Sequence, residues 1–312
     1  MADKIATREA YGKALAEFGA IYDNLVVLDA DLAAATKTGT FKKAFPDRFF
    51  DCGIAENNMI GVATGLSLSG KIPFASSFAM FAAGRSFEQI RNSIGYPHNN
   101  VKIGATHAGI TVGEDGATHQ CCEDIALMRT IPGMVILNPA DAVEARLAVK
   151  AAIEYVGPVY LRFGRMAVPV LFDESYEFKI GRGVKMADGD DVALIATGIE
   201  VDQALQAREI LAAEGISASV VNISTIKPLD EELIVAEASR CGAVVTCEEH
   251  TIIGGLGGAV AECLAEKRPT PVLRVGINDE FGRSGPAKEL VPYYHLDAAS
   301  IAEKAKAAIR LK

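Results

Sequence analysis

Short apolar runs alternate with helix-like stretches through the first half of the chain. The runs with strand character span residues 25–28, 48–52, 72–76, 101–106, 134–137 and 159–163. This β/α alternation predicts a mainly parallel sheet with helices on both faces, because parallel strands need long crossover connections that pack back onto the sheet. Ligands bind outside the carboxyl ends of the strands in such sheets, so the residues that follow each run are the first candidates for a site.

A polar stretch over residues 173–191 interrupts the alternation, and its Asp188-Gly189 pair is typical of a hairpin or a linker. Beyond it the alternation restarts, with strands expected at 192–196, 218–223 and 243–246 and helices at 201–213, at 231–239 and after the glycine-rich turn 254–258. A chain of 312 residues exceeds the usual size of one domain. We therefore predict an α/β protein with two doubly wound, mainly parallel-sheet domains: residues 1–175, a linker at 176–190, and a smaller domain at 191–312.

Composition excludes several classes of function. The net charge is -9 and basic residues are scattered singly, so no basic stripe is available for nucleic acid. No uninterrupted apolar run reaches ~18 residues, which argues against a membrane span, and the charged N-terminus has no apolar signal core, which favours a cytoplasmic protein. The six cysteines lack the paired spacing of a zinc site, so we expect reduced thiols and no metal site in this chain.

The segment from His107 to Gln120 combines two histidines, two carboxylates and three glycines directly after an apolar run. Glycine allows close backbone approach or positive φ, and histidine exchanges a proton near neutral pH, so the segment has the character of an active-site loop. Three interpretations of His107 and His119 stay open: metal ligation, structural histidines with satisfied hydrogen bonds, and proton transfer or substrate hydrogen bonding. We favour the third, because the spacing is not that of a helical His-Glu-x-x-His zinc site.

Glu56 and two phenylalanines are further candidates. Glu56 opens a nearly uncharged helical stretch, where it is either an ordinary helix-start carboxylate or a tuned acid. Phe78 and Phe81 follow the third apolar run three residues apart, so they share one face of a helix that begins near Ala79, where a flat ring could stack on them. Their alternative role is ordinary core packing.

Three of these segments together resemble the transketolase family of thiamine diphosphate enzymes. They are Gly-Ile-Ala-Glu-Asn-Asn-Met-Ile-Gly around Glu56, Ser-Ser-Phe-Ala-Met-Phe at 76–81, and the whole loop from His107 to Gln120. The resemblance covers nearly all of the chain and implies a pyrimidine-binding domain followed by the family's C-terminal domain.

The resemblance also implies roles for individual residues at the cofactor. Glu56 corresponds to the glutamate that contacts pyrimidine nitrogen N1′, Phe78 and Phe81 to the aromatic residues that stack on the pyrimidine, and Asp31 to an aspartate near the thiazolium side. His119 corresponds to a histidine that hydrogen-bonds or exchanges protons at the reacting centre.

At the sugar, Asp115 corresponds to the residue that contacts the hydroxyl next to the ketose carbonyl. His107, Arg8 and Arg165 correspond to a cluster that binds the sugar phosphate, with Arg162 as an alternative or companion to Arg165. The phosphate-binding serine that often follows the family's Asp-Leu is absent, so Thr36 or Lys37 is expected to substitute for it.

The family's diphosphate half is missing from this sequence, because no Gly-Asp-Gly followed by paired asparagines occurs in it. We therefore expect one subunit of a split transketolase, whose N-terminal partner carries the diphosphate and Mg²⁺ or Ca²⁺, in a heterotetramer. The expected reaction is transfer of a two-carbon ketol unit between sugar phosphates. Alternatives are a carboligase similar to 1-deoxyxylulose-5-phosphate synthase, a subunit similar to the oxo-acid dehydrogenase E1 β subunit, and a non-catalytic scaffold.

Overall fold

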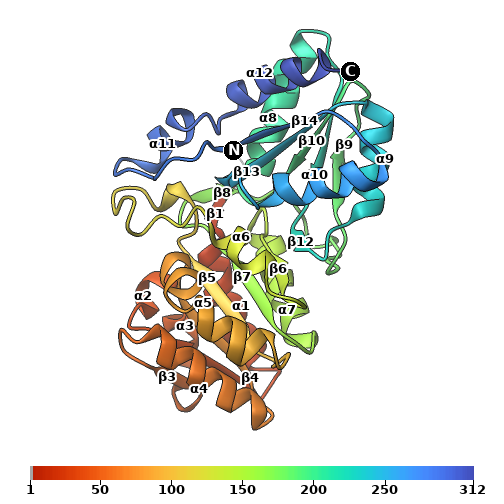
Figure 1. Cartoon of the computed structure of the whole chain (residues 1–312). Helices are drawn as coiled ribbons and strands as arrows, with labels where there is room; N and C mark the ends of the chain where they lie inside the picture. Colours follow the sequence, from red (N-terminus) through yellow and green to blue (C-terminus); the bar gives the residue numbers. More distant parts are fainter. Residues whose placement is uncertain (1–2) are drawn as a thin grey trace.

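The computed structural model describes residues 3–312, which form two α/β lobes stacked along the long axis in Figure 1. The first lobe contains a seven-stranded sheet of order β12-β6-β7-β5-β4-β2-β3, parallel except for β12. Its strands are β2 (Leu25–Asp29), β3 (Phe49–Asp51), β4 (Ile72–Phe78), β5 (Lys102–Thr106), β6 (Val135–Leu137), β7 (Val159–Arg162) and β12 (Thr225–Lys227). The six runs predicted in the first half of the sequence all form strands of this sheet.

Helices cover both faces of the first sheet. The α-helices are α1 (Thr7–Gly19), α2 (Ala33–Thr36), α3 (Gly39–Ala44), α4 (Glu56–Leu68), α5 (Phe87–Gln89), α6 (Asp124–Arg129) and α7 (Ala142–Glu154). Two π-helical segments, Met80–Arg85 and Ile90–Gly95, flank α5, and short 3-10 turns span Pro46–Arg48 and Ile110–Val112. Apolar residues of α1 and α7 form a core on one face, and those of α4 and α6 form a core on the other.

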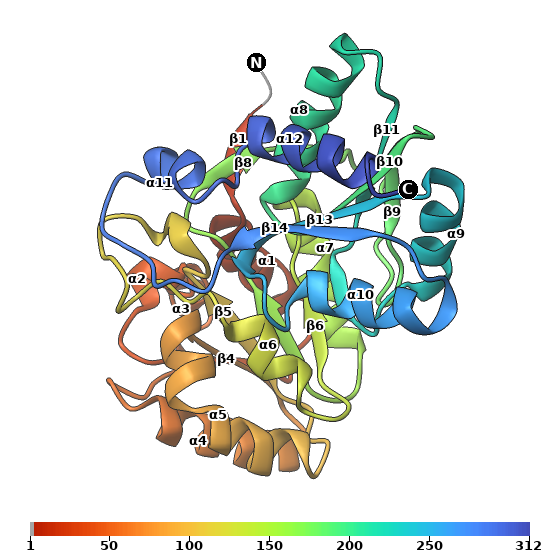
Figure 2. The ribbon, with the colours of Figure 1, turned by 45° about the horizontal axis from the view of Figure 1, so that its top comes forward.

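The second lobe contains a five-stranded sheet of order β14-β13-β10-β11-β9, parallel except for β9. Its strands are β9 (Val184–Ala187), β10 (Val192–Ala196), β11 (Ala218–Asn222), β13 (Val244–Thr251) and β14 (Val272–Ile277). Helices α8 (Glu200–Ala213), α11 (Ala287–Tyr293) and α12 (Ala298–Ile309) cover one face, while α9 (Glu231–Cys241) and α10 (Leu256–Lys267) cover the other. Figure 2 shows β14 at the edge of this sheet, next to β13. The prediction of two mainly parallel, doubly wound sheets is confirmed.

Three strands pair with segments that are not their neighbours in the sequence. Strand β9 lies inside the expected linker 176–190, and it pairs with β11 and not with β10, so the Asp188-Gly189 turn does not close a hairpin. Strand β12 follows β11 in sequence yet adds an antiparallel edge to the first sheet, where Thr225 pairs with Leu137. Near the N-terminus, β1 (Lys4–Ala6) pairs with β8 (Ala167–Pro169) in a two-stranded sheet. Within residues 3–312 no helix is both long and apolar enough to cross a membrane.

Candidate active site

The predicted site residues lie at the carboxyl edge of the first sheet. Strands β2, β4, β5 and β7 are parallel neighbours, so their carboxyl ends meet at one edge. Phe78 ends β4, His107 directly follows β5, and Asp31 lies two residues after β2. Asp31 is exposed and has a φ of +62°, a left-handed conformation that is uncommon outside glycine and asparagine. Its backbone N–H donates to Asp51 Oδ1 at 3.2 Å, which fixes the turn that presents its side chain.

Glu56 is the first residue of α4, and it is only 1% exposed. The helix-start position favours a negative charge, and a guanidinium completes the environment: Arg85 Nη1 donates to Glu56 Oε2 at 2.7 Å. The Arg85 guanidinium also lies over the Phe81 ring, 4.8 Å from its centroid. One side chain, that of Arg85, therefore connects Glu56 to the aromatic residues after β4.

Aromatic contacts join the phenylalanines to both histidines. The Phe78 and Phe81 rings are nearly parallel, with centroids 5.7 Å apart and an interplanar angle of 13°. His107 stacks on Phe78 at 3.8 Å, and His119 contacts Phe81 edge-on at 5.3 Å. Phe78 is 7% exposed, while Phe81 and His119 are half-buried. The four rings form one wall at the end of β4 and β5.

His107 is a neutral hydrogen-bond acceptor towards Arg8. Arginine can only donate, so the 3.0 Å contact between Arg8 Nη1 and His107 Nε2 leaves Nε2 without a proton. The ring proton then lies on Nδ1, which is 2.9 Å from Thr106 Oγ1. Burial, followed by the positive charges of Arg8, Arg165 and Lys37, lowers the pKa of His107 to about 3. This geometry favours a binding role for His107 over proton transfer near neutral pH.

Positive charge gathers around His107. Burial, then the nearby charge of Arg165, lowers the pKa of Arg8, which shows that the two guanidinium groups share one region. Arg8 Nη1 also donates to the Ala35 carbonyl at 2.8 Å. Arg165 Nη1 lies 3.5 Å from Asp115 Oδ2 and 3.8 Å from Glu114 Oε2. The predicted pair Arg8 and Arg165 is therefore brought to the histidine loop, and Asp115 lies beside it.

Thr36 does not have the predicted orientation. It is fully buried, and its hydroxyl donates to Asp29 Oδ2 at 2.7 Å, as does that of Thr38 at 2.8 Å. Burial raises the pKa of Asp29 to about 6, against the opposing effect of hydrogen bonds from these hydroxyls and from the Leu32 N–H. The Thr36 hydroxyl is therefore engaged with Asp29, and its role in phosphate binding stays a prediction. Lys37, the alternative, keeps a third of its side chain exposed and has a φ of +71°.

Arg162 is also unsuited to the predicted phosphate role. Its side chain is 4% exposed, and Nε lies 2.9 Å from Asp124 Oδ2. Nη2 donates to the Glu249 carbonyl at 2.8 Å, and Tyr160 donates its phenolic hydrogen to Asp124. Nε and Nη2 of the guanidinium thus belong to a buried network between the two lobes. These buried contacts favour Arg165 over Arg162 as the phosphate ligand, and both roles stay predictions.

The second lobe holds the histidine loop in place. Gln120 donates from Nε2 to the carbonyls of Ile110 and Gly113 and to that of Arg283 across the lobe boundary, at 2.9 to 3.2 Å. Glu249 Oε1, from β13, accepts a hydrogen bond from the Thr111 N–H at 2.7 Å. Sequence reasoning missed Glu249 and Asp124 because their partners lie far away in the chain. It missed Arg85 because only the observed π-helical segment brings that residue to Glu56.

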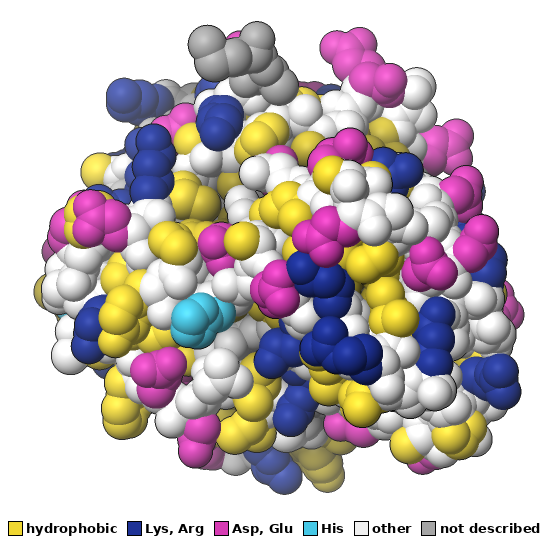
Figure 3. All heavy atoms as spheres, turned by 90° about the horizontal axis from the view of Figure 1, so that it is seen from above, with side chains coloured by type: hydrophobic (Ala, Val, Ile, Leu, Met, Phe, Trp, Pro, Cys, Tyr) yellow, Lys and Arg dark blue, Asp and Glu magenta, His cyan; other side chains and the backbone are white. Residues whose placement is uncertain are grey.

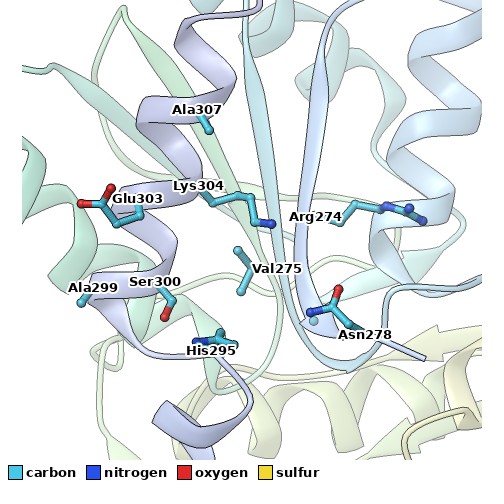
Figure 4. Close-up of a pocket in the computed structure, with 10 residues that line it drawn as sticks. Arg274, Val275, Asn278, His295, Ala299, Ser300, Glu303, Lys304 and Ala307 are labelled. Atoms are coloured by element: carbon cyan, nitrogen blue, oxygen red, sulfur yellow. The ribbon is translucent and has the colours of Figure 1, made fainter. Parts of the chain in front are cut away.

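One cavity borders this region, and another lies entirely within the second lobe. One of about 710 Å³ is lined by Phe81, Arg85, Thr118 and Gln120 together with residues 279–282 of the second lobe. A second, of about 510 Å³, lies between β14 and α12, with Lys304 and His295 beside it, while Arg274 points away and donates to the Ile252 carbonyl (Figure 4). Only residues of the second lobe line the latter, so it is separate from the candidate site.

The face in Figure 3 carries acidic side chains interspersed with basic ones. Among residues 3–312 no group of three or more His, Cys, Asp or Glu side chains is arranged to hold a metal ion.

Comparison with known families matches both lobes. A model of the transketolase pyrimidine-binding domain matches residues 3–170, and a model of the transketolase C-terminal domain matches residues 181–301. The chain therefore belongs to the transketolase family.

Individual relatives define its place in that family. The chain is 55% identical over 300 residues to a putative transketolase C-terminal section of Methanocaldococcus jannaschii, covering 95% of this chain and 94% of the relative. It is 43% identical over 298 residues to a 6-deoxy-6-sulfo-D-fructose transketolase subunit of Clostridium sp. (strain MSTE9), covering 96% and 92%. A solved structure of a split-gene transketolase, an inactive β4 tetramer, has 55% identity, a TM-score of 0.93 and 99% coverage of both chains. The chain thus corresponds to the C-terminal section of a split transketolase.

Proposed function

We propose that this chain is the C-terminal subunit of a thiamine diphosphate-dependent transketolase that transfers a two-carbon ketol unit from a ketose phosphate to an aldose phosphate. The observation that carries the proposal is a single continuous set of contacts. It runs from Glu56 through Arg85 to Phe81, onward to Phe78 and His107, and ends at Arg8. This set joins a buried carboxylate, an aromatic wall and a cluster of cationic side chains around His107.

The residues present fit the pyrimidine half of the cofactor. Within residues 3–312, the Glu56 carboxylate accepts one hydrogen bond at Oε2 and none at Oε1. Oε1 is therefore available to accept a hydrogen bond from a ring nitrogen of the cofactor. Phe81 is half-buried and offers a flat apolar surface next to it. Thiamine diphosphate, when bound, supplies a nucleophilic carbon and an electron sink. Glu56 would hold a proton at pyrimidine nitrogen N1′, while Phe78 and Phe81 exclude water from the ring.

The opposite side of the aromatic wall suits an anionic sugar. Arg8, Lys37 and Arg165 all act on His107 as positive charges, and their donors can bind the oxygens of a phosphate. His119 and Asp115 extend from the same loop into more exposed positions, where they can bind the hydroxyl groups next to the ketose carbonyl. His119 is the residue we propose for proton exchange at the sugar, because His107 is held neutral by its neighbours.

The remaining half of the site is proposed to come from a separate N-terminal subunit that holds the diphosphate through Mg²⁺ or Ca²⁺. The exposed face of α4 supports such an association: Val62 is 39% and Leu68 73% exposed, and a Cβ added at Gly61 or Gly65 would meet nothing within 4 Å. A flat, partly apolar helix face permits close packing of another subunit. We propose a heterotetramer located in the cytoplasm.

Reconstitution tests this proposal directly. The chain would be mixed with its candidate N-terminal partner, thiamine diphosphate and Mg²⁺, and assayed with xylulose 5-phosphate and ribose 5-phosphate. We expect ketol transfer by the mixture and almost none by either subunit alone. Robust turnover by the isolated chain would exclude the split site.

Substrate class is tested in the same mixture. Exclusive use of pyruvate with glyceraldehyde phosphate would indicate a carboligase and not a transketolase. A sulfonated ketose, the substrate type named for the clostridial relative, would compete for the same cationic side chains around His107. We expect preference for the phosphate, because Arg8, Lys37 and Arg165 can together meet its second negative charge.

If Glu56→Gln and His119→Ala both left the activity unchanged, the chain would be a scaffold.

A further inference from the structure

Arg85 is the one charged side chain that forms an ion pair with Glu56 among the described residues, and it lies in none of the three segments that resemble the transketolase family. It ends the π-helical segment Met80–Arg85, and 48% of its side chain is exposed, while Glu56 is buried. The guanidinium is fixed by two contacts, the 2.7 Å hydrogen bond to Glu56 Oε2 and the Phe81 ring at 4.8 Å. These two contacts hold the guanidinium in one orientation, although half of the side chain is exposed to solvent.

The two oxygens of Glu56 have different surroundings. Oε2 accepts the guanidinium, whereas Oε1 receives no hydrogen bond within residues 3–312. The carboxylate can therefore accept a second donor while Arg85 stays in place. A buried carboxylate without a cation favours its neutral form, and an adjacent guanidinium favours the charged form.

We propose that Arg85 is a positioning residue that holds Glu56 charged and correctly oriented, with Oε1 facing pyrimidine nitrogen N1′ of the cofactor. This inference rests on the proposed function. Arg85 acts through Glu56 and does not itself touch the reacting atoms. The alternative is a latch, in which Arg85 occupies the place of the cofactor in the isolated chain and must leave when the cofactor binds.

The two possibilities predict opposite changes in cofactor affinity. Arg85→Gln removes the cation but keeps a polar side chain of similar shape. The Kd of thiamine diphosphate would be measured in the reconstituted complex by calorimetry with Mg²⁺. If Arg85 is a positioning residue, this Kd should rise roughly tenfold, because Glu56 loses one charge-assisted hydrogen bond. Arg85→Lys should recover part of the affinity. An unchanged or lower Kd for Arg85→Gln would overturn the proposal, and a lower Kd would identify the latch.

A double-mutant cycle separates action through Glu56 from a general structural effect. In a Glu56→Gln background, Arg85→Gln should have no further effect on Kd, whereas an undiminished effect would contradict the proposal.

Arg91→Gln is the matched control. Arg91 is exposed on the neighbouring π-helical segment, and its Nη1 donates to Asn92 Oδ1 and not to Glu56. We expect a wild-type Kd from this variant. Failure of the proposed function has a different signature: the wild-type complex would bind thiamine diphosphate, and lose affinity on Arg85→Gln, yet not transfer a ketol unit.

Discussion

Arg162 and Arg165 lie three residues apart, yet their surroundings give them different roles. Arg162 is buried against Asp124, while Arg165 keeps 36% of its side chain exposed beside Asp115. Both residues carry the same group on the same chain segment, so residue type alone could not distinguish them. The distinction comes from Asp124, which lies 38 positions away and meets Arg162 only after folding.

Exchanging each arginine for methionine should separate stability from substrate binding. Arg162→Met leaves the Asp124 charge buried without its partner, so we expect the free energy of unfolding to fall by about 3 to 5 kcal/mol. Arg165→Met should change it by no more than about 0.5 kcal/mol, but should raise the KM for a sugar phosphate roughly tenfold through loss of a charge-assisted hydrogen bond. Urea denaturation and steady-state kinetics of the reconstituted complex measure the two effects. A large KM effect from Arg162→Met without destabilisation would restore its phosphate role.

At the scale of elements, the histidine loop depends on Gly109, because the absence of a side chain there allows the Glu249 carboxylate to approach the loop backbone. Gly109 has a φ of +77°, and a Cβ added there would lie 2.2 Å from Glu249 Cδ. That close approach allows Glu249 to bind the Thr111 N–H and so connects the loop to β13. A side chain at position 109 would separate the two.

Gly109→Ala is therefore expected to lower the free energy of unfolding by at least about 3 kcal/mol, combining left-handed strain with overpacking. Gly70→Ala is the control, because Gly70 has a similar φ of +86° but open space in front of it. It should cost only about 1 kcal/mol. Equal losses in the two variants, measured by urea denaturation, would show that the Glu249 contact does not matter.

Elements with a strong local pattern could be predicted, and those set by distant contacts could not. The runs at 25–28 and 192–196 became β2 and β10 because buried parallel strands are continuously apolar. Strand β12 has three residues, two of them polar, and exists because β6 offers it a partner. Likewise Thr36 was expected in the site from its sequence position, but Asp29 binds its hydroxyl.

At the scale of the whole molecule, the two lobes share buried polar contacts and a strand. Strand β12 from the second half completes the first sheet, and Arg162 donates to the Glu249 carbonyl across the boundary. His250 adds a further link: it accepts the Ala126 N–H at Nε2, while its Nδ1 donates to the Thr251 carbonyl at 2.7 Å. We infer that the lobes support one another, so the histidine loop depends on both.

The link through His250 should make part of the stability depend on pH. Burial lowers the pKa of His250 from 6.5 to about 4, so the folded chain keeps this ring neutral while the unfolded chain takes up a proton. Its contribution to the free energy of unfolding is complete above pH 6.5 and is lost as the pH falls towards 4. The loss should amount to roughly 1 kcal/mol per pH unit.

Other groups act in the opposite direction, so the contribution of His250 must be measured as a difference. Burial raises the pKa of Glu248 to about 7, which favours the folded chain at low pH. Glu248 Oε2 lies 3.7 Å from His250 Nδ1, so the stability of the wild type minus that of His250→Asn removes only the part of this effect that the two proteins share. The difference should fall between pH 6.5 and pH 4. His98→Asn, at an exposed position with a φ of +57° that asparagine tolerates, should leave the slope of the wild type unchanged. If the His250→Asn difference were flat over this range, the buried neutral ring would not be a source of stability, and the connection between the lobes would rest on β12 and Arg162.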